Sequence, residues 1–230
     1  MKKVKILILG SKEYPFGCGD DKIKSGGIET YTEGLVDELK KNKDINIAII
    51  TRKFQNQKSH QINENIEIWR VNWIRGFYFR NISFNFSAFI KAFSLDFDVI
   101  LAQGPIAVFF SVILSKFKKF KLIARCAGIS TSQPQYSKVL RKIFFYLEKY
   151  VYERADAVVF GSAEEKTQFE KKLGFMPKNN KIIPSGVKIH IFVSDKKTIE
   201  KYNPKNKTLI CFVGRLLQVK GVKYLIQAVN

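Results

Sequence analysis

The chain has 230 residues, of which 46% are hydrophobic and 26% are charged. This composition excludes a disordered or fibrous protein, and the length allows one large or two small domains. Forty Lys and Arg against twenty Asp and Glu give a net charge of +20, which attracts polyanions such as nucleic acid, anionic lipid or phosphorylated substrates. Because the excess is mostly Lys and is spread over the whole chain, a compositional bias of the source explains it equally well.

The cysteines and the apolar runs bear on the compartment. Cys18, Cys126 and Cys211 stand far apart, without the spacing of a zinc site or a disulfide framework, so a reduced, cytosolic compartment is the simplest inference. The N-terminal apolar run ends at Leu9 and is too short for a signal peptide. The longest internal run, 105–115, is too short to span a membrane, so we expect no transmembrane segment, although contact with a membrane surface stays open.

The first elements are predicted to be a buried strand and a helix. Val4–Leu9 is continuously apolar and is followed by Gly10, as in a strand buried on both faces of a parallel sheet. A loop rich in glycine and charge closes with Ser25, Gly26 and Gly27. From Ile28 onward, apolar residues recur at helical spacing with Glu and Lys between them, which predicts a helix.

The same alternation continues along the chain. Ser162 stands where it would cap a helix that follows the strand ending at Phe160. Predicted strands occupy 45–50, 66–71, 98–102, 122–124, 157–160 and 181–184, and predicted helices occupy 84–93, 106–114 and 136–152. Strands that alternate with helices imply βαβ units, so the predicted fold class is α/β with a doubly wound parallel sheet.

The composition changes late in the chain. We interpret residues 1–190 as a Rossmann-like domain and the polar, turn-prone residues 191–207 as a linker. Within residues 208–230, Leu209–Val213 is a new apolar strand candidate and Val222–Val229 an amphipathic helix candidate. One strand and one helix cannot bury their own apolar faces, so we expect a second Rossmann-like domain that this chain begins and does not finish.

Three local signals concern binding. Gly26 and Gly27 precede a helix, where free N–H groups and the helix dipole favour a phosphate, although such a pair is more often only a turn. Pro184–Val187 follows a strand and on its own is more often a bare domain exit. Arg215 and Lys220 precede the last predicted helix, either as a cationic pair for a pyrophosphate or as solvated surface cations. No GxGxxG motif supports a dinucleotide site.

Together these segments resemble the family 4 glycosyltransferases, which have the GT-B fold. The matching segments are Gly26–Glu29, Asp98–Ala102, Ala124–Gly128, Glu148–Tyr152, Ala155–Val159 with Ser162, Ile183–Val187, Phe212–Leu216, Lys220–Val222 and Leu225–Ala228. Each match is weak by itself. The set is specific because its members follow the family order from about residue 4 to the last residue.

The resemblance implies a nucleotide-sugar donor held in a cleft between two Rossmann-like domains. Arg215 and Lys220 would hold the donor diphosphate and, as catalytic residues, stabilise the charge on the leaving pyrophosphate. Gly26 and Gly27 would meet the phosphate from the first domain through a backbone N–H. No cofactor and no metal is expected.

The resemblance also implies transfer with retention of configuration to an acceptor bound mainly by the first domain. Arg125, Gly128 and Ser130 form the candidate acceptor pocket, with Arg125 in place of a His that many relatives carry near this segment. The loop 73–83 is rich in aromatic and basic residues that suit a sugar face or a membrane surface, but we favour inward packing of its aromatics. Relatives often show Asp where this chain has Lys188.

The predicted function is hexosyl transfer from a nucleotide sugar to a glycan or lipid-linked acceptor, as in polysaccharide biosynthesis. The family's Glu-x7-Glu segment would lie beyond residue 230, so we expect a fragment or truncated product that is inactive by itself. Two other functions stay open: a non-catalytic module that binds an acceptor or a membrane, and a basic nucleic-acid-binding protein, which no motif supports. The expected location is cytoplasmic, with peripheral contact at an anionic inner membrane face left open.

Overall fold

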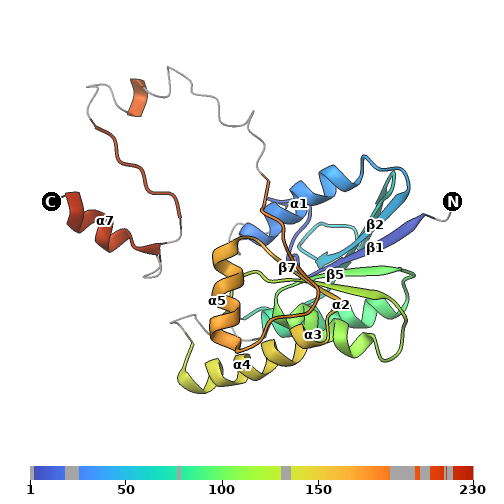
Figure 1. Ribbon diagram of the computed structural model, residues 1–230. Helices are drawn as coiled ribbons and strands as arrows, with labels where there is room; N and C mark the ends of the chain where they lie inside the picture. Colours follow the sequence, from blue (N-terminus) through green and yellow to red (C-terminus); the bar gives the residue numbers. More distant parts are fainter. Residues whose placement is uncertain are drawn as a thin grey trace. The chain divides into compact units, whose positions relative to one another are not determined.

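The chain divides into two compact units, Met1–Gly186 and Val187–Asn230. The computed structural model describes residues 3–18, 26–76, 79–130, 136–186, 200–202, 208–214, 216 and 220–229. The first unit carries the sheet and five helices (Figure 1). The predicted linker, 191–207, lies outside the described residues except for a helical turn at 200–202, so its extent stays a prediction.

An eight-stranded sheet forms the centre of the first unit, in the order β3-β4-β2-β1-β5-β6-β7-β8. Its strands are β1 (Val4–Leu9), β2 (Ile45–Arg52), β3 (His60–Asn63), β4 (Ile66–Val71), β5 (Val99–Gln103), β6 (Lys121–Arg125), β7 (Ala157–Phe160) and β8 (Asn180–Ile182). All neighbours are parallel except β3 and β4. The predicted doubly wound parallel sheet is therefore confirmed.

Strand β3 is the one strand of this sheet that the sequence pattern missed. Its residues, His60–Asn63, are mostly polar and sit at the sheet edge, so they lack the apolar run of a buried strand. A two-residue turn joins β3 to β4, and Glu64 in that turn has a left-handed φ of 51°. Only its pairing with β4 marks this segment as a strand.

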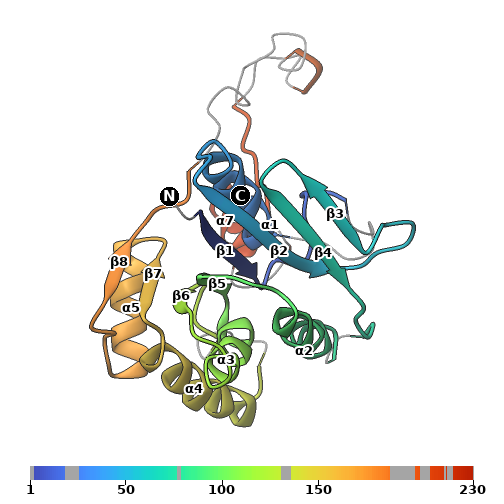
Figure 2. The same cartoon turned by 90° about the vertical axis from the view of Figure 1, so that its right-hand side faces the viewer.

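Helices cover both faces of the sheet unequally (Figure 2). The helices of the first unit are α1 (Gly27–Leu39), α2 (Arg80–Phe93), α3 (Pro105–Leu114), α4 (Lys138–Glu153) and α5 (Ala163–Leu173). Helix α1 packs on one face through Val36, whereas α2, α3, α4 and α5 pack on the other, larger core. As predicted, Ser162 caps α5: its Oγ accepts a hydrogen bond from the Glu165 N–H at 3.0 Å.

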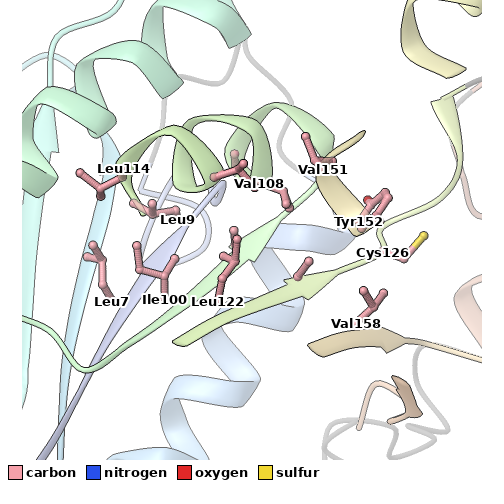
Figure 3. Packing of buried hydrophobic residues seen from close by; sticks show 14 of the residues in the cluster. Leu7, Leu9, Ile100, Val108, Leu114, Leu122, Cys126, Val151, Tyr152 and Val158 are labelled. Atoms are coloured by element: carbon pink, nitrogen blue, oxygen red, sulfur yellow. The ribbon is translucent and has the colours of Figure 1, made fainter. Parts of the chain in front are cut away.

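The larger core lies between the sheet and these four helices (Figure 3). Leu7 and Ile100 point into it from neighbouring strands, and Val108 and Val151 meet them from α3 and α4. Phe169 of α5 is fully buried in the same core. Burial of these side chains fixes the helices against the face of the sheet. The N-terminus of α3 thereby lies at the carboxyl end of β5, and ligands bind beyond such strand ends in this fold.

The second unit differs in part from the sequence prediction. Helix α7 (Val222–Val229) forms as predicted. The strand predicted at Leu209–Val213 is wrong for this structure, because the described residues 208–214 belong to no sheet. A strand needs a neighbour for its backbone N–H and C=O groups, and the described residues offer this segment none.

Candidate functional site

The sheet has a topological switch point between β1 and β5. From β1 the chain proceeds through α1 to β2 on one side, whereas β5 leads through α3 to β6 on the other. In open α/β sheets, ligands bind beyond the carboxyl ends of the strands at such a point. Gly10 follows β1 with φ 97°, and a Cβ there would overlap the backbone carbonyl of Gln103. The two strand ends therefore approach so closely that only glycine fits.

A cavity of about 170 Å³ opens at this switch point. Its lining comes from the ends of β1 and β5, from the N-termini of α1 and α3, and from α2 and α4. The lining residues are Gly10, Lys12, Ile28, Asn81, Phe84, Asn85, Gln103, Gly104, Pro105, Ile106, Ala107, Ser130, Tyr136 and Phe144. Amide and hydroxyl groups beside aromatic rings suit the hydroxyls and apolar faces of a sugar.

Gln103 is the polar group most deeply buried in this lining. Its side chain is 3% exposed, and its Nε2 donates to the Thr32 hydroxyl at 2.7 Å. The Gln103 Oε1 is buried and has no hydrogen-bond partner among the described residues. A buried acceptor without a donor is costly, and because Gln103 lines the cavity, a rotation of its side chain toward the cavity would let this oxygen accept a hydroxyl from a ligand or a water. No motif or periodicity in the sequence singles out this glutamine.

The N-terminus of α1 is held by a buried carboxylate. Glu29 is 1% exposed, and its two oxygens accept the backbone N–H of Gly26 at 2.8 Å and of Lys12 at 3.1 Å. The ammonium of Lys12 lies 3.8 Å from the same carboxylate. Glu29 thereby joins the loop after β1 to the start of the helix. The next N–H groups of α1, beginning with that of Gly27, have no intrahelical acceptor and remain suited to an anion.

The three residues expected in the acceptor pocket have different surroundings. Ser130 lines the cavity, and its N–H donates to Glu148 at 2.7 Å. The Gly128 N–H donates to Glu165 at 2.9 Å, and Gly128 is not among the lining residues. Arg125, which is 8% exposed, does not line the cavity and takes no part in the hydrogen bonds to Glu148 or Glu165.

Arg125 lies on the α1 side of the sheet. Its guanidinium carbon is 3.6 Å from the ring centroid of Tyr31, and its Nη2 donates to the Ser185 hydroxyl at 3.2 Å. This contact joins the end of β6 to the Pro184–Val187 segment, which by sequence alone is more often a bare domain exit. Arg125 is not among the residues that line the cavity, and its role in an acceptor pocket stays a prediction.

The described aromatics of the loop 73–83 differ in their packing: Trp73 packs against the larger core, whereas Phe79 is 63% exposed, so the predicted inward packing is wrong for Phe79. The indole N–H of Trp73 donates to the Lys53 carbonyl at 3.1 Å, which confirms the favoured inward packing for this aromatic. Arg52, which the sequence did not indicate, is fully buried against the Trp73 ring, 4.6 Å from its centroid. Burial and the neighbouring Arg80 lower the pKa of Arg52 to about 10. Phe77 and Tyr78 lie outside the described residues.

The predicted cations belong to the second unit. Arg215 lies outside the described residues. Lys220 is exposed and directly precedes Gly221, which has φ 70° and leads into α7. The pairing of these cations with Gly27 on one diphosphate therefore stays a prediction. Within the described ranges, no group of three or more metal-ligating side chains occurs, and no helix has the length and apolarity to cross a membrane.

Comparison with known proteins assigns the chain to a family. The model of Glycosyltransferase Family 4 matches residues 25–190, which include α1, β5 and all of the cavity lining except Gly10 and Lys12. An uncharacterized glycosyltransferase of Methanocaldococcus jannaschii, MJ1069, is 29% identical over 248 residues. This match covers 99% of the chain and 59% of the relative, so the chain spans little more than half the length of that protein.

Solved structures show the same architecture. Sucrose-phosphate synthase from Thermosynechococcus elongatus superposes with a TM-score of 0.81 at 17% identity, over 99% of this chain and 59% of the other. Anabaena HepE in complex with UDP-glucose superposes with a TM-score of 0.67 at 18% identity, over 98% of this chain and 57% of the other. The Rossmann-like GT-B fold expected from the sequence is confirmed. By its match over residues 25–190, the chain belongs to glycosyltransferase family 4.

Proposed function

We propose that the chain is the acceptor-binding part, with the beginning of the donor-binding part, of a retaining hexosyltransferase that uses a nucleotide sugar. The observation that carries this proposal is the cavity at the β1/β5 switch point, in a chain of family 4. The donor class is supported by HepE, which was solved with UDP and with UDP-glucose. The acceptor is a glycan or a lipid-linked sugar.

The donor diphosphate would bind at the N-terminus of α1. The N–H of Gly27 and the helix dipole would face the phosphate from the first unit, while Glu29 keeps the preceding loop in place. Arg215 and Lys220 would supply the positive charge from the second unit. Because cleavage of the sugar–phosphate bond leaves negative charge on the diphosphate, fixed cations there lower the barrier without a metal ion.

The acceptor sugar would occupy the cavity. Gln103 Oε1 would accept one of its hydroxyls, and Asn85 and Ser130 offer further polar groups in the lining. The rings of Phe84 and Phe144 provide apolar surface for a sugar face. In a retaining transfer the acceptor hydroxyl attacks from the side on which the diphosphate leaves, which requires the two subsites to be adjacent. The α1 N-terminus and the cavity meet this requirement, since Ile28 lines the cavity.

The donor part of the proposal is tested with UDP. We expect weak binding by the purified chain, seen as broadening of the UDP phosphorus signals in ³¹P NMR, and unchanged by EDTA. Arg215→Ala or Lys220→Ala should remove the broadening. Lys223→Ala is the matched control and should leave the broadening unchanged, because it deletes an exposed cation of α7 three residues after Lys220. If the broadening persists in both Arg215→Ala and Lys220→Ala, the assignment of these two cations to the diphosphate would be contradicted.

The acceptor part is tested separately with Gln103→Leu. This change keeps the size of the side chain and removes the unpaired oxygen, so saturation-transfer NMR signals from methyl hexosides should be lost while UDP broadening remains. Asn65→Leu is the control, because its Oδ1 is also buried and unpaired among the described residues, but it lines a different cavity at the opposite edge. Equal loss in both variants would argue against a sugar subsite at Gln103.

A further inference from the structure

Three neighbouring helices of the first unit expose large apolar side chains. Helices α2, α3 and α4 lie one beside the next on one side of the sheet (Figure 2). The face turned away from the sheet, here called the outer helix face, carries large apolar side chains. Its exposed members are Ile82, Phe86, Ile90 and Phe93 of α2, Phe117 after α3, and Val139, Ile143 and Tyr146 of α4. Contiguous apolar surface of this kind marks an interaction site.

Aromatic rings make this face continuous between α2 and α3. The Phe86 ring lies 6.0 Å from Phe110, and Phe89 lies 5.6 Å from the same ring. At the other end, Phe93 lies 5.7 Å from Phe117, whose side chain is 67% exposed. The residues are therefore not isolated surface aromatics but one connected ring surface across two helices.

Helix α4 extends the face with a stripe of its own. Val139, Ile143 and Tyr146 follow one another at spacings of four and three residues, so they share one side of the helix. The buried residues Glu148 and Tyr152 lie on the opposite side of α4. The apolar stripe is thus directed away from the core and is not explained by packing within the chain.

Positive charge surrounds this apolar surface. Helices α2 and α3 contain no acidic residue. Lys116 and Lys119 follow α3, and Lys138 and Lys142 lie in the first turns of α4; none of the four has an ion-pair partner among the described residues. An apolar, aromatic surface bordered by unpaired lysines complements the headgroup region of an anionic bilayer.

We propose that the outer helix face docks the protein onto an anionic phospholipid membrane. The aromatic rings enter the headgroup boundary, and the lysines contact lipid phosphates. The inner sides of α2 and α4 supply Phe84 and Phe144 to the cavity, so the docked helices also form part of its wall. If the proposed function holds, a lipid-linked acceptor would reach the cavity from the same membrane; docking itself does not depend on it.

Vesicle flotation with the purified chain tests docking. We expect the protein to float with vesicles made of equal parts of phosphatidylcholine and phosphatidylglycerol, and not with phosphatidylcholine alone. Because each lysine at an anionic surface contributes about 1 kcal/mol, or about fivefold, Lys116→Glu/Lys119→Glu should weaken binding by about 25-fold or more. The matched control is Lys43→Glu/Lys58→Glu, two exposed lysines in other loops, with little effect expected.

The apolar contribution has its own variant pair. Phe86→Ser/Phe117→Ser should weaken binding at least tenfold, since both rings would leave the lipid, whereas Phe16→Ser, an exposed aromatic in the loop after β1, should not. Circular dichroism and melting of each variant show whether it has folded. Binding to neutral vesicles as strong as to anionic ones would overturn the proposal. So would a dimer in sedimentation velocity that Phe86→Ser/Phe117→Ser dissociates, without lipid binding.

Discussion

Glu29 offers the sharpest test of how the candidate donor subsite is held. Glu29→Ala removes the acceptor for two backbone N–H groups, those of Gly26 and Lys12. Each donor left without a partner costs about 1–3 kcal/mol, and the loss of a negative charge in the first helical turn adds about 0.5 kcal/mol. We therefore expect a loss of about 2.5–6.5 kcal/mol in the free energy of unfolding.

The assay is chemical denaturation together with thermal melting and amide hydrogen exchange. For a unit of this size, 3 kcal/mol corresponds to a decrease in Tm of about 6–12 °C. The amides of Gly26 and Lys12 should exchange faster than in the parent chain. Glu38→Ala is the control, because Glu38 lies on the same helix but forms only an exposed pair with Lys41, worth less than about 0.5 kcal/mol. Equal destabilisation by the two variants would refute the reasoning.

Three further predictions concern the frame around the site. Gly10→Ala should cost about 2–4 kcal/mol in denaturant unfolding, because its Cβ would overlap the Gln103 carbonyl, whereas Gly17→Ala, at a similar φ of 83° in open space, should cost about 1 kcal/mol. Phe169→Ala should cost about 3–5 kcal/mol, since it empties a fully buried site. Burial, with Asp37 and Glu33 nearby, raises the pKa of Tyr14 to about 12, so the folded state keeps a proton that the unfolded state loses above pH 10. The contribution of Tyr14 to the free energy of unfolding should therefore be lost as the pH rises from 10 to 12. Tyr14→Phe should reduce this loss, measured as the shift of the denaturant midpoint with pH.

The layout of the sheet could be predicted because its strands are buried on both faces. Val4–Leu9 and Val99–Gln103 are nearly uninterrupted apolar runs, and such runs need no knowledge of the neighbouring strands to be identified. The cap at Ser162 is likewise a local signal, since the hydroxyl and the N–H that it accepts lie three residues apart.

The cavity could not be predicted in the same way. Gln103 and Arg52 are polar residues at strand ends, and their burial follows from the order of the strands and from contacts with Thr32 and Trp73 far away in sequence. Local periodicity contains no information about such contacts. Arg125 is a further example: its place in an acceptor pocket stays a prediction, and its contact with Tyr31 of α1 could not be read from local sequence.

A map of amide chemical shifts in the ¹⁵N-labelled chain, recorded during titration with UDP, tests most directly whether ligands bind at the β1/β5 switch point. The predicted result is saturable shifts at Gly26, Gly27 and Ile28. A second, larger cavity of about 370 Å³ at the opposite edge of the sheet, lined by Lys5 and Asn46 among others, provides the contrast. Saturable shifts confined to that edge, or none at any UDP concentration, would contradict the account.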